Sequence, residues 1–452
     1  MEVSLMSSSQ AKICKTELGC KDLRLRKTGI RFSAKAVDSE PILETKSSTS
    51  SKSLDRLRLF VGLPLDTVSD GSTINHARAI AAGLKALKLL GVEGVELPVW
   101  WGVVENEEMG KYHWSGYLAV AEMVQKAGLK LHVSLCFHSS DEPKIPLPKW
   151  VMKIGESQSS IFFTDRSGHH YRKCLSLAVD DLPVLDGKTP IQVYQDLCES
   201  FKSAFSPFIG STITGISMGL GPDGELRYPS HHKPKCAKNG TISGVGEFQC
   251  YDTNMLKLLK QHAEANGNPL WGLGGPHDAL VMISHRTGIT SSTITVGLGK
   301  VLMATSSFLG IQASSCRDVC KEFVQTHLAG MDLSDKNQPH DSLSSPESLL
   351  AQIQATCNKH EVEVAGQNLA SGSPGGLEQI KKNMLGDNPI DLFTYQRMGA
   401  HFFSPEHFPS FTEFIRSLNQ PEMHPDDMPS EEVEATESVQ TSSDPNIHLQ
   451  TA

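Results

Sequence analysis

The stretch of residues 219–229 joins a carboxyl group to a glycine-punctuated loop. It reads Gly-Leu-Gly-Pro-Asp-Gly-Glu-Leu-Arg-Tyr-Pro and follows an apolar, β-prone run at 213–218. The glycines and the proline let the backbone turn sharply and come close to a ligand. Glu225 lies in that bend, and a carboxyl at the end of a strand can act as a general acid when burial raises its pKa. The local pattern alone also fits a glycine-rich turn with a solvated glutamate.

A second stretch, residues 246–252, reads Gly-Glu-Phe-Gln-Cys-Tyr-Asp. Together with the first stretch it resembles the plant β-amylases, a family of inverting glycoside hydrolases on a (β/α)8 barrel. These enzymes release maltose from the non-reducing ends of α-1,4-glucans. The resemblance implies the same barrel here, and it implies that Glu225 occupies the position of the general acid.

Inverting hydrolysis needs a second carboxyl, which acts as the base that activates water. In active β-amylases this base is the glutamate of an Ala-Gly-Glu-Asn motif, and the matching residues 365–368 read Ala-Gly-Gln-Asn. Gln367 therefore occupies the base position, and an amide can orient a water molecule but cannot accept its proton. The next acid, Glu378, follows a Gly/Pro-rich loop and is a poor substitute. The sequence predicts a catalytically inactive member of the family.

Other departures from the family point the same way. Pro98 stands before Val-Trp-Trp-Gly, where the family has an aspartate that grips the terminal glucose. The segment after His138 is shorter than the family's glycine-rich loop, which carries a second substrate-binding aspartate and closes over the sugar. Asp141 is a weak candidate for a displaced remnant of that aspartate. Gly330 lies opposite a threonine of the family's inner loop.

The resemblance retains part of a substrate site. It implies substrate-binding roles for His138, Asn368 and Arg397, with Trp100 and Trp101 as a candidate stacking surface for sugar. The alternative for His138 is an ordinary histidine at the barrel rim, and the alternative for the tryptophans is core packing. We expect the retained half-site to hold a glucan end without cutting it.

Apolar patterning predicts the elements that position these side chains. Strands are expected at 58–65, 94–101, 130–138, 213–220, 361–366 and 390–395, and helices at 75–90, 117–126 and 190–204. Strands that alternate with helices indicate a parallel sheet covered on both sides. Periodicity alone also fits a doubly wound sheet, and the barrel follows from the resemblance. In a barrel, functional residues gather at the carboxyl ends of strands, where this chain places its candidates.

The resemblance stops in the segment 279–329 and resumes at Gly330. Family members are longer here and carry a substrate-binding motif with paired tryptophans, whereas this segment has no Trp or Tyr. We therefore expect a disrupted fifth β/α unit. An abrupt loss and recovery suggests a spliced-out or frame-shifted gene model, and transcripts that encode this segment unchanged, with no longer form, would argue against that hypothesis.

Composition sets the boundaries of the molecule. Residues 1–55 are rich in Ser, Lys and Arg and resemble a plastid transit peptide, although a mitochondrial one or a disordered basic tail also fits. Residues 56–418 should form the barrel, and 419–452 an acidic disordered tail. The net charge of −9 argues against nucleic acid as a partner, and no apolar run is long enough for a membrane span. The ten cysteines form no CxxC pair, and nothing in the sequence calls for a metal or another cofactor.

These observations predict an inactive β-amylase-family protein of starch breakdown in the plastid stroma. Its expected ligands are starch, α-1,4-glucan or maltooligosaccharides, and other starch-degrading enzymes are candidate partners. The main alternative is an active exo-hydrolase that releases maltose and tolerates Gln367. A third hypothesis is a scaffold that binds no sugar.

Overall fold

The computed structural model describes residues 57–219, 221–224, 249–274, 325–338, 345–359, 363–369, 375–385 and 390–419. All of them belong to one of the two units into which the chain divides, residues 53–452. The predicted transit segment 1–55 and nearly all of the predicted acidic tail lie outside the described residues.

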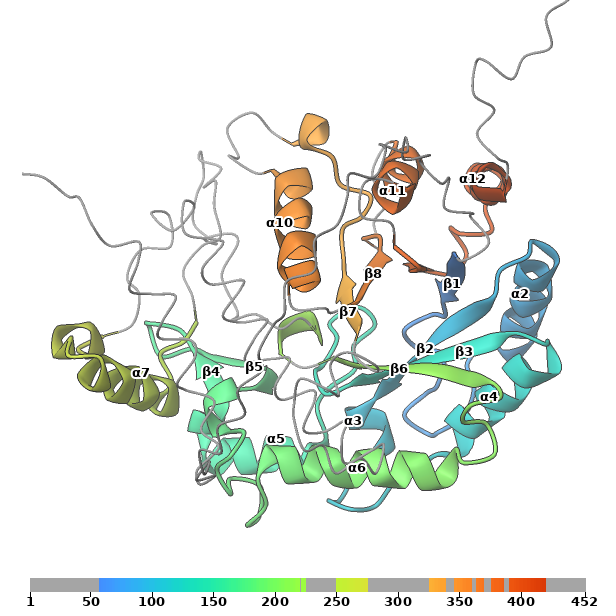
Figure 1. The fold of residues 1–452 in the computed structure, drawn as a ribbon. Helices are drawn as coiled ribbons and strands as arrows, with labels where there is room; N and C mark the ends of the chain where they lie inside the picture. Colours follow the sequence, from blue (N-terminus) through green and yellow to red (C-terminus); the bar gives the residue numbers. More distant parts are fainter. Residues whose placement is uncertain are drawn as a thin grey trace, which may run out of the picture. The chain divides into compact units, whose positions relative to one another are not determined.

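Among the described residues, the main sheet has seven parallel strands in the order β6-β3-β2-β1-β9-β8-β7 (Figure 1). The first strand of the chain therefore pairs with the last, with Phe60 beside Thr394 and Val61 beside Tyr395. The strands are β1 (Arg58–Gly62), β2 (Gly94–Trp100), β3 (Lys130–Cys136), β6 (Ile213–Gly219), β7 (Gln325–Leu328), β8 (Glu363–Gln367) and β9 (Leu392–Tyr395).

This strand order is that of a (β/α)8 barrel, in which consecutive strands are neighbours and the eighth pairs with the first. The sequence-based expectation of this fold is confirmed. The fifth barrel position falls between β6 and β7, and the chain between these strands includes residues 275–324, which lie outside the described residues. The expected disruption of the fifth unit therefore stays a prediction.

Helices connect the strands and cover the sheet. They are α2 (Ala77–Leu89), α3 (Trp101–Val104), α4 (Ser115–Lys126), α5 (Lys149–Ser157), α6 (Pro190–Ala204), α7 (Thr253–Ala265), α10 (Pro346–Lys359), α11 (Gly376–Leu385) and α12 (Phe408–Asn419). Between α5 and α6 the chain forms a small antiparallel hairpin of β4 (Phe162–Thr164) and β5 (His170–Leu175). Short 3-10 turns include Pro222–Gly224 and Asp335–Asn337.

The core forms where the strands meet the helices. Strand β1 is buried from Leu59 to Gly62, and β9 is buried throughout, as expected for parallel strands that are covered on both faces. The largest fully buried side chains are aromatic and include Trp101, Tyr117, Phe137, Phe201, Phe393 and Phe411. No helix among the described residues has both the length and the apolar character that a membrane crossing requires.

Candidate functional site

Gln367 is the last residue of strand β8 and Asn368 follows it, close to the strand end that the sequence predicts for a barrel site. Asn368 is buried, with 2% of its surface exposed, and its amide binds the backbone of Gln396. Its Oδ1 accepts a hydrogen bond from the Gln396 N–H at 2.7 Å, and its Nδ2 donates to the Gln396 carbonyl at 2.8 Å. Asn368 thereby fixes the chain that leaves β9, directly before Arg397. The structure gives this residue a scaffolding role at the site.

Gln396 connects two other side chains at the same level of the barrel. Its Nε2 donates to Oε2 of Glu96 at 2.5 Å and to Oε1 of Gln367 at 3.3 Å. Glu96 lies in the middle of β2, and Gln367 closes β8, so the link runs across the interior between strands that are not neighbours. The base position is therefore part of a hydrogen-bonded chain that begins at a carboxylate.

Arg397 lies beside this chain. Its Nη1 donates to the carbonyl oxygen of Leu63, just after β1, at 2.6 Å. Burial lowers the pKa of the guanidinium, and the charge of Glu96 acts in the opposite direction. Arginine keeps its proton even when buried, so Arg397 supplies a fixed positive charge on this side of the site.

His138 and Trp100 form a second group of predicted site residues. Their rings meet edge to face with centroids 5.2 Å apart, and the Nδ1 of His138 lies 3.0 Å from the carbonyl oxygen of Ser139. Two glycines make room for the ring: a Cβ on Gly219 or Gly224 would lie 3.2 Å or 2.8 Å from Nε2 of His138. The histidine is thus held tightly after β3.

The predicted acid, Glu225, lies outside the described residues. Gly224 directly precedes it and has a φ of 82°, a left-handed conformation that favours glycine. Gly224 is the last described residue before Glu225 and lies against His138. The general-acid role of Glu225 stays a prediction.

Trp100 and Trp101 are buried, with 2% and 1% of their surface exposed. Trp100 donates its Nε1–H to the Leu65 carbonyl at 2.7 Å. Trp101 begins helix α3 instead of ending β2, and its Nε1 donates to Glu105 at 2.7 Å. In this structure neither ring is an open sugar platform, and both follow the alternative of core packing.

The segment after β1 joins the two groups. Arg397 donates to Leu63, and Trp100 donates to Leu65 two residues further on. The predicted residues therefore gather around one backbone segment at the carboxyl ends of the strands. Asp141, the weak candidate for a displaced aspartate, forms an ion pair with Lys173 of β5.

The segment that follows β7 is tied to the end of β8. The Leu369 N–H donates to Oδ1 of Asp332 at 2.8 Å, and the Met331 N–H donates to the Gln367 carbonyl at 3.0 Å. Gly330, where the family has a threonine, has a φ of 86°. A β-branched residue adopts this conformation only with strain, so glycine suits the backbone found here.

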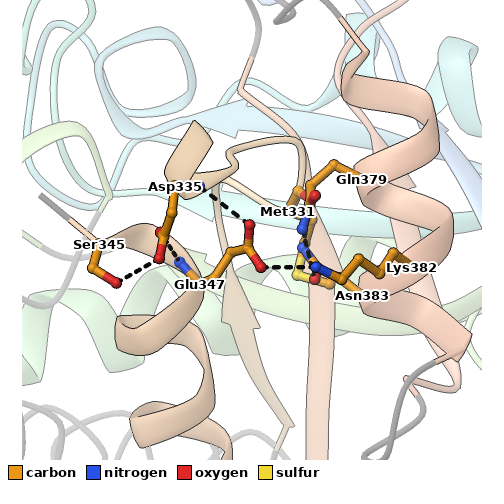
Figure 2. Close-up of polar contacts among 7 residues, drawn as sticks. All are labelled: Met331, Asp335, Ser345, Glu347, Gln379, Lys382 and Asn383. Atoms are coloured by element: carbon orange, nitrogen blue, oxygen red, sulfur yellow. Dashed lines mark hydrogen bonds and ion pairs between the residues drawn. The ribbon is translucent and has the colours of Figure 1, made fainter. Parts of the chain in front are cut away.

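Two helices hold this segment from the outside (Figure 2). Asp335 accepts a hydrogen bond from the Glu347 N–H at the start of α10, at 3.0 Å, and its own N–H donates to Oε1 of Glu347 at 3.2 Å. Lys382 of α11 donates to Oε2 of Glu347 at 2.8 Å, which lowers the pKa of that carboxyl. Asn383, also of α11, donates to the Met331 carbonyl at 2.9 Å.

Sequence reasoning missed Glu96 and Gln396. A signal was present for Glu96, because it is a charged residue within the otherwise apolar strand Gly94–Trp100, and parallel barrel strands are buried on both faces. Gln396 directly precedes the predicted Arg397 but belongs to no family motif that the sequence reveals. Within the described ranges, no group of three or more His, Cys, Asp or Glu side chains could hold a metal ion.

Comparison with known proteins agrees with this geometry. The model of glycosyl hydrolase family 14 matches residues 60–293. A protein of Arabidopsis thaliana named inactive beta-amylase 9 is 48% identical over 96% of this chain and 97% of its own length. That alignment spans 524 residues, more than the 452 of this chain, so the relative has residues without a counterpart here.

Two further similarities are to proteins named as beta-amylases. Beta-amylase 2, chloroplastic, of Oryza sativa subsp. japonica is 32% identical over 80% of this chain and 77% of its own length. The crystal structure of the catalytic domain of a beta-amylase from Paenibacillus polymyxa superposes with a TM-score of 0.63 at 22% identity, covering 81% of this chain and 99% of that one. The last similarity supports the barrel fold, and the sequence matches establish descent: the chain belongs to glycosyl hydrolase family 14, with the plant beta-amylases.

Proposed function

We propose that this protein is a catalytically inactive β-amylase-family member that binds ends of α-1,4-glucan without hydrolysing them. The observation that carries the proposal is the side chain at the base position. Gln367 is an amide, and its Oε1 already accepts a hydrogen bond from Gln396. An inverting enzyme needs a carboxylate there to take a proton from water, and an amide has no such capacity.

The nearest carboxylate to Gln367 in this hydrogen-bonded chain is Glu96, which is separated from it by the Gln396 amide. A general base must lie within hydrogen-bond reach of the proton it removes, directly or through one water. Glu96 is already bound to Gln396, so it does not replace the missing base. The Arabidopsis relative at 48% identity, named as inactive, supports the same conclusion.

Retained residues supply the binding half of the proposal. The described contacts of Arg397 use one of its five N–H donors, at the Leu63 carbonyl. His138 remains after β3 beside the chain that leads to the predicted acid. A polar half-site of this kind suits a sugar end, whose hydroxyl groups both donate and accept hydrogen bonds.

The same proposal covers the rest of the chain. Residues 1–55 act as a plastid transit segment that leads the protein to the stroma, 56–418 form the barrel and 419–452 an acidic tail. Relatives named chloroplastic support the plastid location. Starch or maltooligosaccharide is the ligand, and other starch-degrading enzymes are the protein partners.

The test measures maltose release and glucan binding separately. The purified protein is incubated with soluble starch, and retention in amylose-containing gels is recorded by affinity electrophoresis. We expect retardation by the glucan and no maltose. Maltose release by the unmodified chain would overturn the proposal in favour of an exo-hydrolase, and absence of both would favour a scaffold that binds no sugar.

A variant pair isolates the role of the base position. Gln367→Glu restores a carboxylate there, and Gln125→Glu on the exposed face of α4 adds the same charge away from the sheet. Weak maltose release by the first variant alone would identify the base as the chief missing part. If neither variant releases maltose while both still bind glucan, the short segment after His138 contributes as much to the loss of activity as the missing base.

A further inference from the structure

The side-chain amides of Gln367 and Gln396 form one chain with the Glu96 carboxylate. The two distances are 2.5 Å from Gln396 Nε2 to Glu96 Oε2 and 3.3 Å from the same nitrogen to Gln367 Oε1. The three residues come from β2, from the end of β8 and from the residue after β9. Nothing in the family's motifs assigns a function to Glu96.

The direction of this chain follows from its first member. A carboxylate only accepts hydrogen bonds, so the Gln396 atom that faces Glu96 must be the amide nitrogen. That nitrogen carries a second hydrogen, which is donated to Gln367. Gln367 must therefore present its oxygen to Gln396 and its own Nε2 to the opposite side. Gln367 is half-buried, so part of this residue is accessible.

The Glu96 carboxylate favours this order of the Gln396 amide over the reverse. The side chain of Asn368 binds the backbone N–H and the backbone carbonyl of Gln396. The Oε1 of Gln396 is buried without a hydrogen-bond partner among the described residues, and a Cβ on Gly62 would lie 2.6 Å from it. The charge of Arg397 also interacts with that of Glu96. A reversed amide would place the Gln396 oxygen against the Glu96 carboxylate, which is a repulsive contact.

We propose that Glu96 is a positioning residue that, through Gln396, holds Gln367 with its amide nitrogen toward the ligand, so that the base position presents a hydrogen-bond donor. This inference rests on the proposed binding function of the same site. The chemical group that Gln367 recognises is an acceptor oxygen of a glucan, either a hydroxyl or the ring oxygen.

The donor orientation has a consequence for water as well as for sugar. A water molecule at the base position would receive an N–H hydrogen bond on a lone pair of its oxygen. Attack at the anomeric carbon needs that oxygen's lone pair and the removal of a proton. The amide would thus engage the lone pair that the attack needs and would accept no proton. Glu96, by fixing this orientation, would reinforce the loss of catalysis.

A double-mutant cycle tests this arrangement in the full-length protein. Maltotriose affinity is measured by calorimetry for the wild type, Glu96→Met, Gln367→Met and the double variant. Without Glu96 the amide of Gln367 can reverse and explore other rotamers, so the competent fraction falls and the dissociation constant should rise about two- to fivefold. In the Gln367→Met background the Glu96 substitution should change nothing, because its effect passes through Gln367.

A spectroscopic readout needs no sugar and separates this inference from the proposed function. The protein is labelled with ¹⁵N-glutamine, and Gln367→Met and Gln396→Met identify the two side-chain amide signals. We expect slow solvent exchange at Gln396 and faster exchange at Gln367, and the Gln396 signal should shift in Glu96→Met. If the wild type does not bind maltotriose but shows these signals, the proposed binding function is wrong and the proposed orientation of Gln367 stands.

Two outcomes overturn the inference. One is a Gln396 signal that is unchanged by Glu96→Met, and the other is an equal loss of affinity with or without Gln367. Glu96→Gln serves as a second variant if Glu96→Met does not fold, because an amide at 96 permits both directions of the chain. Glu378→Gln, on the exposed side of α11, is the matched control and should leave both readouts unchanged.

Discussion

The side chain of Asn368 binds both backbone polar groups of Gln396. Its Oδ1 accepts a hydrogen bond from the Gln396 N–H at 2.7 Å, and its Nδ2 donates to the Gln396 carbonyl at 2.8 Å. This contact joins the ends of β8 and β9 inside the barrel. It places Gln367 and Arg397, the neighbours of the two residues, at the same site. The geometry of the site therefore depends on one buried amide.

Loss of this contact should destabilise the protein. Asn368→Ala leaves the N–H and the carbonyl of Gln396 without their partner in a buried place, which costs about 1–3 kcal/mol. Urea unfolding followed by tryptophan fluorescence measures the change. The matched control is Asn266→Ala, which removes an exposed hydrogen bond to His262 and should alter stability by less than about 0.5 kcal/mol. Equal effects of the two variants would contradict this account.

Gly62 leaves little room for a side chain. A Cβ at this position would lie 2.6 Å from Oε1 of Gln396 and 3.2 Å from Oε2 of Glu96. Gly62→Ala should therefore lower the free energy of unfolding by about 1–3 kcal/mol, as other overpacked cores do. Gly399→Ala, where a Cβ meets nothing within 4 Å, is the control.

A second substitution distinguishes overpacking from a backbone effect at Gly62. Shortening the side chain in Gly62→Ala/Gln396→Ser removes the atoms that the new methyl group would strike. In thermal unfolding, Gly62→Ala should therefore cost much less stability in the Gln396→Ser background than it costs in the wild type. An equal cost in the two backgrounds would mean that the glycine is needed for its backbone.

Glu105 should make stability depend on pH in a particular direction. Burial raises the pKa of this carboxyl to about 6, although hydrogen bonds from the Gly110 N–H and the Trp101 indole oppose the shift. The folded state therefore binds the proton more readily than the unfolded state. Stability from this group is present below the unfolded value of 4.5 and is lost as the pH rises to about 6.

The comparison of wild type with Glu105→Gln isolates this contribution. The difference in unfolding free energy between the two proteins should change by about 2 kcal/mol between pH 4 and pH 7, in the sense that the wild type loses stability relative to the variant as the pH rises. Glu122→Gln on the exposed face of α4 removes a surface carboxyl and is the matched control. An opposite slope for Glu105 would mean that its hydrogen bonds outweigh burial.

The contacts of Figure 2 should differ in strength. Asp335→Ala removes the acceptor of the Glu347 N–H and of the Ser345 hydroxyl at the start of α10, and loss of such a cap costs about 1 kcal/mol. Lys382→Met removes an ion pair whose lysine side chain is 66% exposed, and exposed pairs contribute less than about 1 kcal/mol. Denaturant unfolding should rank the aspartate above the lysine.

Local signals in the sequence were sufficient for much of the scaffold. The helix expected at 190–204 has these bounds in the structure, because Thr189 and Gln192 form a capping box and Pro190 suits the first turn. The strand expected at 94–101 stops one residue earlier, since Trp101 turns inward to bind Glu105. The sequence left the tryptophans open between a stacking surface and core packing, because burial is a tertiary property.

The candidate site was predictable only where a family motif covers it. Gln367, Asn368 and Arg397 were found through motifs, and the structure brings them together. The Glu96–Gln396 pair was missed because its members are 300 residues apart in the chain, and neither shows by itself that the other lies beside it. A charged residue within an apolar strand was the one available signal.

The pairing of the first strand with the last governs when this site can exist during synthesis. The hydrogen bond from Arg397 to Leu63 spans 334 residues. At about 5–20 residues per second, a ribosome needs roughly 20–70 s between making the two partners. Throughout that interval β1 lacks one neighbour and the nascent chain has no Gln396 or Arg397 to complete the site. A polypeptide released before residue 396 would lack both the Gln396 link to Glu96 and the Arg397 hydrogen bond to Leu63.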